Sequence, residues 1–140
     1  MPEILCHANT VAVGACGVLI RGASGSGKSS LSLQLMSLGA TLVADDQTRL
    51  SLHNGRVWAE APASIAGLIE ARGVGILRVA HAKAAISLVI DLDQQEMDRL
   101  PVYHSVTILN HSFPCLHKVD NPAWPASIMQ YLKGSRRDPK

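Results

Sequence analysis

The feature that most constrains this chain is the octapeptide at residues 22–29, GASGSGKS. It matches the pattern G-x-x-x-x-G-K-[ST] at every required position. Its three glycines allow successive backbone N–H groups to converge on an anion. Lys28 can reach the outer phosphates of a nucleotide, and the Ser29 hydroxyl can ligate Mg²⁺. The residues expected to contact the phosphates are Gly22, Ala23, Ser24, Gly25, Ser26, Gly27, Lys28 and Ser29.

The residues on either side of the octapeptide supply the context that the motif requires. The short apolar run 17–20 before it is typical of a buried strand. After it, Leu31, Leu35 and Leu38 recur with helical spacing. Gly39 follows where such a helix would end. A strand, a loop and a helix in this order favour a phosphate site over a flexible Gly/Ser segment.

The bulk properties exclude several classes of protein. A chain of 140 residues has the size of one domain. Its formal net charge of +2 gives no reason to expect a nucleic-acid or membrane-surface partner. Three widely spaced cysteines fit no disulfide or zinc framework, which favours a reducing compartment. Since there is no leader pattern and no apolar run of ~20 residues, we expect a soluble cytoplasmic protein.

Two adjacent carboxylates, Asp45 and Asp46, follow the apolar run 41–44, which is expected to be another strand. In an open α/β sheet, ligands bind at the carboxyl ends of the strands. Within a close pair, repulsion raises the pKa of one member unless a cation offsets it. One carboxylate can then organise a metal while the other takes a proton from an attacking hydroxyl. A plain turn is the alternative, and the neighbouring phosphate loop favours the functional interpretation.

Further short elements are expected along the chain. Strands are predicted at 10–13, 85–91 and 102–109, and a hairpin at 49–59 turns at Asn54-Gly55 with Trp58 in the core. Asn121-Pro122 is typical of an N-cap and first helical residue, and this helix should end near Lys133. We therefore expect one domain over 1–134 and a charged, disordered tail over 135–140.

Asp91 competes with the Asp45–Asp46 pair for the role of metal-site acid. The apolar run 85–90 closed by Asp91 has the form of a Walker B strand. Asp93 and Glu96 nearby favour instead an exposed loop that Asp91 opens. The residues alone leave both assignments open.

Four features together resemble the catalytic domain of the bacterial HPr kinase/phosphorylase family. They are His7 ahead of the strands, GASGSGKS, the LVADD strand exit and the segment 69–78, IEARGVGILR. The last is similar to the family signature, which runs close to L-E-[IV]-R-G-L-G-I-I-N. The resemblance covers roughly residues 7–132 and implies a P-loop kinase-like α/β fold of the HPr kinase/PEP carboxykinase type. This fold has a mixed sheet, a phosphate-loop helix and a short C-terminal helix.

The resemblance also implies roles for single residues. ATP would lie on the phosphate loop, where Lys28 neutralises charge, and Mg²⁺ would be held by Ser29 and Glu70. Asp46 would accept the proton of a protein serine hydroxyl, with Asp45 beside it.

Three more residues gain an interpretation from the family. His7, which alone would be a surface or capping histidine, matches an active-site histidine. Arg99, in a D-R-L context, matches an arginine that could stabilise the transferring phosphoryl group. Asp91 would then be a structural residue at a strand end.

The implied activity is phosphorylation of a serine on an HPr-like phosphocarrier protein of a phosphotransferase system. The short chain resembles alphaproteobacterial forms that lack the separate N-terminal domain, and the family implies a homo-oligomer such as a hexamer. At 119–124, VDNPAW stands where bifunctional members have PVRPGR, so both arginines that would hold inorganic phosphate are missing. We therefore predict kinase activity and expect phosphorylase activity to be weak. The alternatives are a non-catalytic ATP-binding regulator and a small-molecule P-loop kinase.

Overall fold

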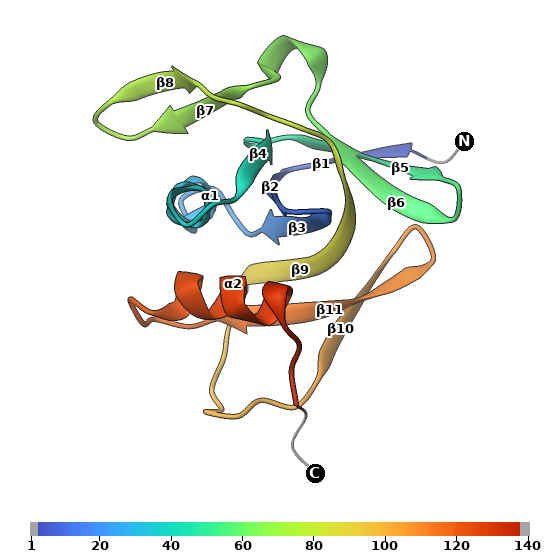
Figure 1. Cartoon of the computed structure of the whole chain (residues 1–140), viewed down its shortest axis with the longest axis vertical. Coiled ribbons are helices and arrows are strands. Elements are labelled where there is room, and N and C mark those ends of the chain that lie inside the picture. The colour runs from blue at the N-terminus through green and yellow to red at the C-terminus, as the bar shows by residue number, and fades with distance from the viewer. Residues whose placement is uncertain (1–2, 138–140) are drawn as a thin grey trace.

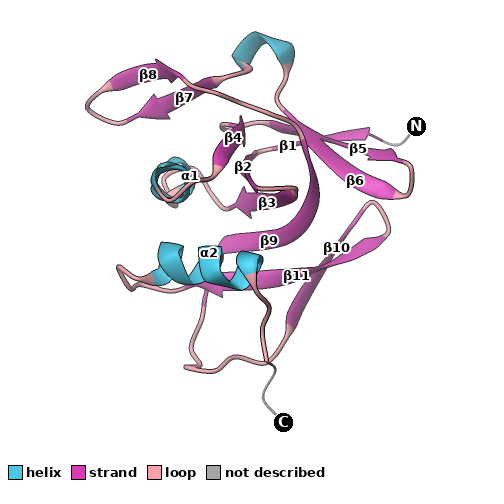
Figure 2. Ribbon diagram, in the orientation of Figure 1, coloured by secondary structure: helices cyan, strands magenta, loops and turns pink. Residues whose placement is uncertain are grey.

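A computed structural model gives the structure of the chain and describes residues 3–137. Strands dominate it, and two α-helices lie against them (Figures 1 and 2). In chain order the elements are β1 (Glu3–Cys6), β2 (Ala8–Val13), β3 (Cys16–Arg21), α1 (Lys28–Ser37), β4 (Thr41–Ala44), β5 (Thr48–His53), β6 (Arg56–Glu60), a 3₁₀ turn (Ala63–Ile65), β7 (Leu68–Ala71), β8 (Gly75–Arg78), β9 (Ala84–Gln95), β10 (His104–Ile108), β11 (His111–Lys118) and α2 (Trp124–Lys133).

One mixed sheet organises the molecule around β9. Its strand order is β1-β5-β6-β9-β3-β2-β4, with β11 also paired to β9 and β10 paired to β11. Both β3 and β11 run parallel to β9. Strand β6 runs antiparallel to β9 and pairs only with the first two residues of β9. The long β9 therefore curves from one partner to the next, as Figure 1 shows. The hairpin β7–β8 forms a separate small sheet.

The face of the sheet that bears the helices holds one of two apolar clusters. Side chains alternate along β3, so Val18 and Ile20 face the helices while Leu19 faces the other way. Leu31 and Leu35 of α1 pack into this helix-side cluster. Helix α2 contributes Ile128, Met129 and Leu132.

The opposite face holds the second cluster, built from strands. It contains Ala8, Ala12, Leu19, Val43, Ala44, Leu50, Val57, Ala59, Ala84, Ile86, Val89, Ile108, Phe113 and Cys115. Ile86 belongs here and Leu88 to the helix side because the β3–β9 register skips a residue between them. At this irregularity a Cβ on Gly17 would meet the Ala85 carbonyl oxygen at 2.7 Å, so only glycine fits. The extra residue lets β9 serve both clusters.

Several predicted elements are confirmed. The chain folds as a strand, a glycine loop (residues 22–27) and a helix, and β4 ends directly before Asp45. In the β5–β6 hairpin, φ is 53° at Asn54 and 74° at Gly55, which is the left-handed pair that a type I′ turn requires. The family signature forms the hairpin β7–β8.

Other expectations are corrected. Helix α1 ends at Ser37, so Leu38 lies at its C-cap and is 45% exposed instead of buried. Strand β9 continues to Gln95, which places Asp91 inside the strand and not at its end. Helix α2 begins at Trp124, because Asn121 uses its side-chain oxygen to accept the Ala123 N–H in a turn before the helix. Trp58 is half-buried, with the Arg56 guanidinium over its ring.

The C-terminal segment beyond α2 is described only to residue 137. There the Arg136 guanidinium donates a hydrogen bond to the Pro101 carbonyl. Residues 138–140 of the expected tail lie outside the described residues. Over residues 3–137, no helix has the length and apolar character needed to cross a membrane.

Leu35 and Leu38, which lie on either side of the end of helix α1, give a test of the fold. Leu35→Ala should lower the free energy of unfolding by about 2–5 kcal/mol, because Leu35 is fully buried between α1 and the sheet. Leu38→Ala removes the same atoms from an exposed position and should change it by less than about 0.5 kcal/mol. Urea unfolding of both variants measures the difference, and equal losses would contradict the helix boundary.

Candidate active site

The glycine loop joins β3 to α1, and its backbone is shaped for close approach. Gly25 and Gly27 have φ values of 83° and 103°, which favour glycine. A Cβ on Gly22 would meet the Ser26 hydroxyl oxygen at 2.6 Å. The Ala23 N–H donates to both carboxylate oxygens of Asp93, at 3.0 and 3.1 Å. The hydrogen bonds to Asp93 therefore anchor the glycine loop to β9.

Lys28 and Ser26 place polar atoms inside this loop. The Lys28 side chain is buried, and its ammonium donates to the carbonyl oxygens of Gly22 at 2.9 Å and Ala23 at 3.1 Å. The Ser26 hydroxyl is also buried, and no hydrogen bond reaches it from the described residues. A buried hydroxyl without a partner is costly, so this atom is suited to a polar ligand.

Asp45 is the point where several elements meet. Its Oδ1 accepts hydrogen bonds from the Ser29 hydroxyl and the Asn9 amide, both at 2.7 Å. Its Oδ2 accepts the Glu70 backbone N–H from β7 at 2.9 Å. This carboxylate is therefore held in one orientation by three donors, with α1, β2 and β7 each supplying one.

Asn9 is a site residue that sequence reasoning missed. It is fully buried in β2, and its amide nitrogen also contacts the Ser32 hydroxyl at 3.0 Å. Its side-chain oxygen accepts the Asp46 backbone N–H at 2.9 Å. One side chain thus connects α1 to both residues of the Asp45–Asp46 pair. The available signal was an amide directly before the apolar run 10–13, which is too common a pattern to single out.

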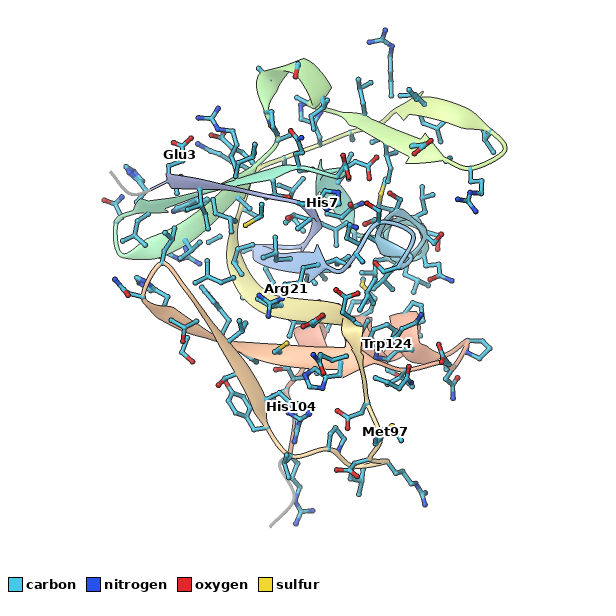
Figure 3. The ribbon with its side chains drawn as sticks, turned by 180° about the vertical axis from the view of Figure 1, so that it is seen from behind. Glu3, His7, Arg21, Met97, His104 and Trp124 are labelled. Atoms are coloured by element: carbon cyan, nitrogen blue, oxygen red, sulfur yellow. The ribbon has the colours of Figure 1, made fainter. Side chains whose placement is uncertain are left out.

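Asp46 lies beside Asp45 but faces different surroundings. Its φ is 70°, and this left-handed turn directs its carboxylate away from Asp45's network. His7 Nε2 lies 2.7 Å from Asp46 Oδ1, with the two side chains 51% and 65% exposed. Figure 3 labels His7, which lies where the chain passes from β1 to β2. Burial raises the pKa of the neighbouring Cys6 thiol, so Cys6 is a poor nucleophile at neutral pH.

A cavity of about 360 Å³ connects these groups. Two more charged side chains line it from the β7–β8 hairpin, Glu70 and Arg72. The full lining is Asn9, Ser24, Gly25, Gly27, Lys28, Ser29, Ser30, Leu33, Asp46, Glu70 and Arg72. We call this space the loop cavity. Among the predicted site residues, it is lined by Ser24, Gly25, Gly27, Lys28, Ser29, Asp46 and Glu70, whereas His7 lines a separate cavity with Cys6 and Arg21.

Arg99 is not brought to the loop cavity. It is exposed in the segment between β9 and β10, and it lines a different cavity with Trp124 of α2. Met97, two residues before it, lies at the far end of the molecule from His7 in Figure 3. The segment 97–103 follows the extended β9, which carries it away from the glycine loop. The expected action of Arg99 within its own chain's cavity is therefore not supported.

Asp91, the competing acid, is engaged elsewhere. Its carboxylate lies 3.7 Å from the Arg21 guanidinium and accepts the Asp93 N–H at 3.0 Å. Its structural interpretation agrees with these contacts, although Asp91 lies within the strand. The segment 119–121 after β11 does reach the glycine loop: Asp120 and Asn121 line a cavity of about 240 Å³ with Ser26.

Comparison with known proteins gives the same family at three levels. The family model described as HPr Serine kinase C-terminal domain matches residues 1–117. HPr kinase/phosphorylase of Caldanaerobacter subterraneus subsp. tengcongensis is 37% identical over 107 residues, which are 70% of this chain and 35% of that protein. The Clostridium tetani HPr kinase/phosphorylase is 34% identical over 113 residues, 72% of this chain and 37% of that protein.

The chain thus spans about a third of the length of these curated relatives. A solved structure of the Hpr(Ser) kinase/phosphatase from Coxiella burnetii superposes with a TM-score of 0.80 at 28% identity. The match covers 93% of this chain and 88% of that one, so the mixed α/β architecture is shared throughout. With its sequence matched from residue 1 to 117, this chain belongs to the HPr serine kinase C-terminal domain family.

Proposed function

We propose that this chain is an ATP-dependent protein serine kinase that phosphorylates an HPr-like phosphocarrier protein. The observation that carries this proposal is the difference between two adjacent carboxylates beside the glycine loop. Asp45 accepts three hydrogen bonds, including one from Ser29. The Asp46 carboxylate bonds only to His7 among residues 3–137 and faces the loop cavity. One acid is thus tied to the binding loop and the other is accessible to an acceptor.

The residues of the loop cavity fit ATP and Mg²⁺. The buried, unpartnered hydroxyl of Ser26 and the ammonium of Lys28 offer donors to phosphate oxygens. Ser29, Asp45 and Glu70 offer the hard oxygen ligands that Mg²⁺ prefers. When bound, the nucleotide and metal supply the phosphoryl group and neutralise its charge. We accordingly assign residues 22–29 as a P-loop, within a P-loop kinase-like domain over 1–134.

Asp46 and His7 are proposed to act on the acceptor. Asp46 Oδ2 carries no hydrogen bond from the described residues, so it can accept the proton of an incoming serine hydroxyl. The 2.7 Å contact with His7 orients the carboxylate from its other oxygen. Because both side chains are more than half exposed, a serine on another protein can reach them. A small-molecule kinase would instead enclose its acceptor.

The names of the relatives support the choice of acceptor. Those from Caldanaerobacter and Clostridium are called HPr kinase/phosphorylase, and the Coxiella structure is an Hpr(Ser) kinase/phosphatase. We extend from them the phosphocarrier substrate. A cytoplasmic location and a homo-oligomeric state are proposed from the sequence resemblance alone. The non-catalytic regulator remains the contrasting outcome, which a transfer assay distinguishes.

Asp46→Asn should abolish phosphoryl transfer while leaving nucleotide binding intact. Loss of the proton acceptor should slow transfer by about 10²–10⁴-fold, measured as labelled phosphate moving from ATP to an HPr-like protein. ATP affinity should stay near that of the wild type because Asp45 and the glycine loop are unchanged. Glu60→Gln, an exposed carboxylate at the end of β6, is the control. Labelling that survives Asp46→Asn, or that the wild type never shows, refutes the proposal.

Substitutions at two adjacent buried polar residues of β2, Asn9 and Thr10, distinguish a loss of stability from a loss of nucleotide binding. Asn9→Ala should weaken Mg²⁺-ATP binding by about 10- to 100-fold, because it removes the group that holds Asp45 and contacts Ser29. Thr10→Val breaks a buried 2.9 Å contact with Thr48 on the opposite face. Both variants should lose about 1–3 kcal/mol of stability. Calorimetric titration with Mg²⁺-ATP should show a defect in the Asn9 variant alone.

Phosphorolysis should be weak in the wild-type protein. Residues 119–121 lie beside the glycine loop without an arginine, and Asp120 adds a negative charge there. Two missing charge-assisted contacts of about 1.5 kcal/mol each correspond to a roughly 100-fold loss. The test is to incubate phosphorylated carrier and inorganic phosphate with this protein and, separately, with the Clostridium tetani relative. The rates at which the two enzymes dephosphorylate the carrier are then compared. Equal rates of dephosphorylation would contradict the prediction.

A further inference from the structure

Glu96, His104 and His117 form a compact cluster that the proposed kinase activity does not use. One potential ligand atom from each residue lies within 4.8 Å of the other two. His104 Nε2 is 3.0 Å from Glu96 Oε1. The two imidazole rings stack with centroids 4.0 Å apart and planes 12° from parallel. All three residues are partly buried.

From this arrangement we infer that the cluster is a binding site for a transition-metal dication of the zinc class. Two imidazoles and one carboxylate are a donor set typical of zinc with an open fourth position. Tetrahedral bonds of about 2.0–2.1 Å place ligand atoms about 3.3 Å from one another. The 3.0 Å contact is close to this spacing, and all three ligand atoms lie within 4.8 Å of one another. Coordination requires the two stacked rings to tilt so that their in-plane lone pairs converge on the ion.

The surroundings of the cluster favour a ligand over a plain hydrogen bond. Glu96 Oε2 accepts the Asp98 N–H at 3.1 Å, so the carboxylate is oriented with Oε1 toward His104. The half-buried ring of His117 makes no hydrogen bond with any residue of 3–137 through its nitrogens, although it stacks on His104. An imidazole without a partner beside an oriented carboxylate is poised for coordination.

The backbone builds this cluster through a large irregularity in β9. Asp91 pairs with His117, but the next residue, Lys118, pairs with Gln95. The intervening residues of β9 bulge out, and the Glu96 N–H then bonds to the Lys118 carbonyl at 2.8 Å. Glu96 is thereby brought next to His117. Figure 3 shows His104 on this part of the molecule, with Arg21 between it and His7.

A bound metal would fix the ends of one exposed segment. Glu96 and His104 flank residues 97–103, of which Met97 is 84% and Leu100 75% exposed. The same segment carries Arg99, and the bulge that precedes it carries Asp93, which bonds to the glycine loop. The metal therefore restrains both the arginine segment and the strand beneath the loop. The metal site itself is inferred without reference to the proposed phosphoryl transfer.

Cobalt titration of the full chain tests the site. The EDTA-treated protein, kept in excess Mg²⁺, should bind one Co²⁺ with the visible spectrum of tetrahedral coordination, and Zn²⁺ should displace it. Glu96→Gln and His104→Gln should each weaken binding by at least about 10- to 100-fold, whereas His53→Gln, on the exposed end of β5, should not. Circular dichroism checks that the variants are folded. No tetrahedral spectrum in the wild type, or unchanged binding in both cluster variants, overturns the inference.

Limited trypsin digestion gives a second readout. Zn²⁺ should slow cleavage after Arg99 in the wild type, because the metal would hold together Glu96 and His104, the two ends of the segment that contains this bond. Cleavage after Arg72, in the β7–β8 turn, is the internal control and should not change. In His104→Gln, Zn²⁺ should protect neither site. Protection of Arg99 that persists in His104→Gln would contradict the assignment of His104 as a ligand.

Discussion

The buried amide of Asn9 is the interaction on which the site depends. Each of its polar atoms must find a partner, because the residue is fully removed from solvent. It satisfies them on the Asp45 carboxylate, the Ser32 hydroxyl and the Asp46 backbone. A strand, a helix and a strand exit are thereby fixed relative to one another. The directions of the two carboxylates follow from this arrangement, and so does the division of roles proposed for them.

Strand β9 provides the second constraint, through its two irregularities. The first, opposite Gly17, lets the strand serve both apolar clusters. The second, opposite His117, directs Asp93 to the glycine loop and Glu96 to the two histidines. A regular strand would present alternate residues to two faces and could not bring these side chains to different places within six residues. The first irregularity therefore determines how β9 packs, and the second determines where its polar side chains Asp93 and Glu96 lie.

Local patterns predicted the elements near the motif well. The octapeptide and the Asn54-Gly55 turn depend on nearest neighbours in the sequence and formed where expected. Strands also formed at the predicted apolar runs, although β9 continues to Gln95 and β10 spans only His104–Ile108. Asn9 escaped notice because its importance comes from partners 20 to 37 residues away. The placement of Arg99 depends on how far β9 extends, and a run of polar residues at 93–96 gave no sign of a strand. Long-range pairing with β11 overrides that local pattern.

The hydrogen bonds of the glycine loop have a consequence for exchange of the nucleotide proposed to bind there. Two backbone carbonyls hold the Lys28 ammonium, and the Asp93 carboxylate occupies the Ala23 N–H. The chain thus carries its own substitutes for the oxygen atoms of a bound anion. Arrival of a phosphate at these groups is a swap of partners, so the free energy gained is a difference between two sets of hydrogen bonds. Departure of the nucleotide proposed for this site would leave no buried cation bare, an arrangement that favours exchange over tight retention.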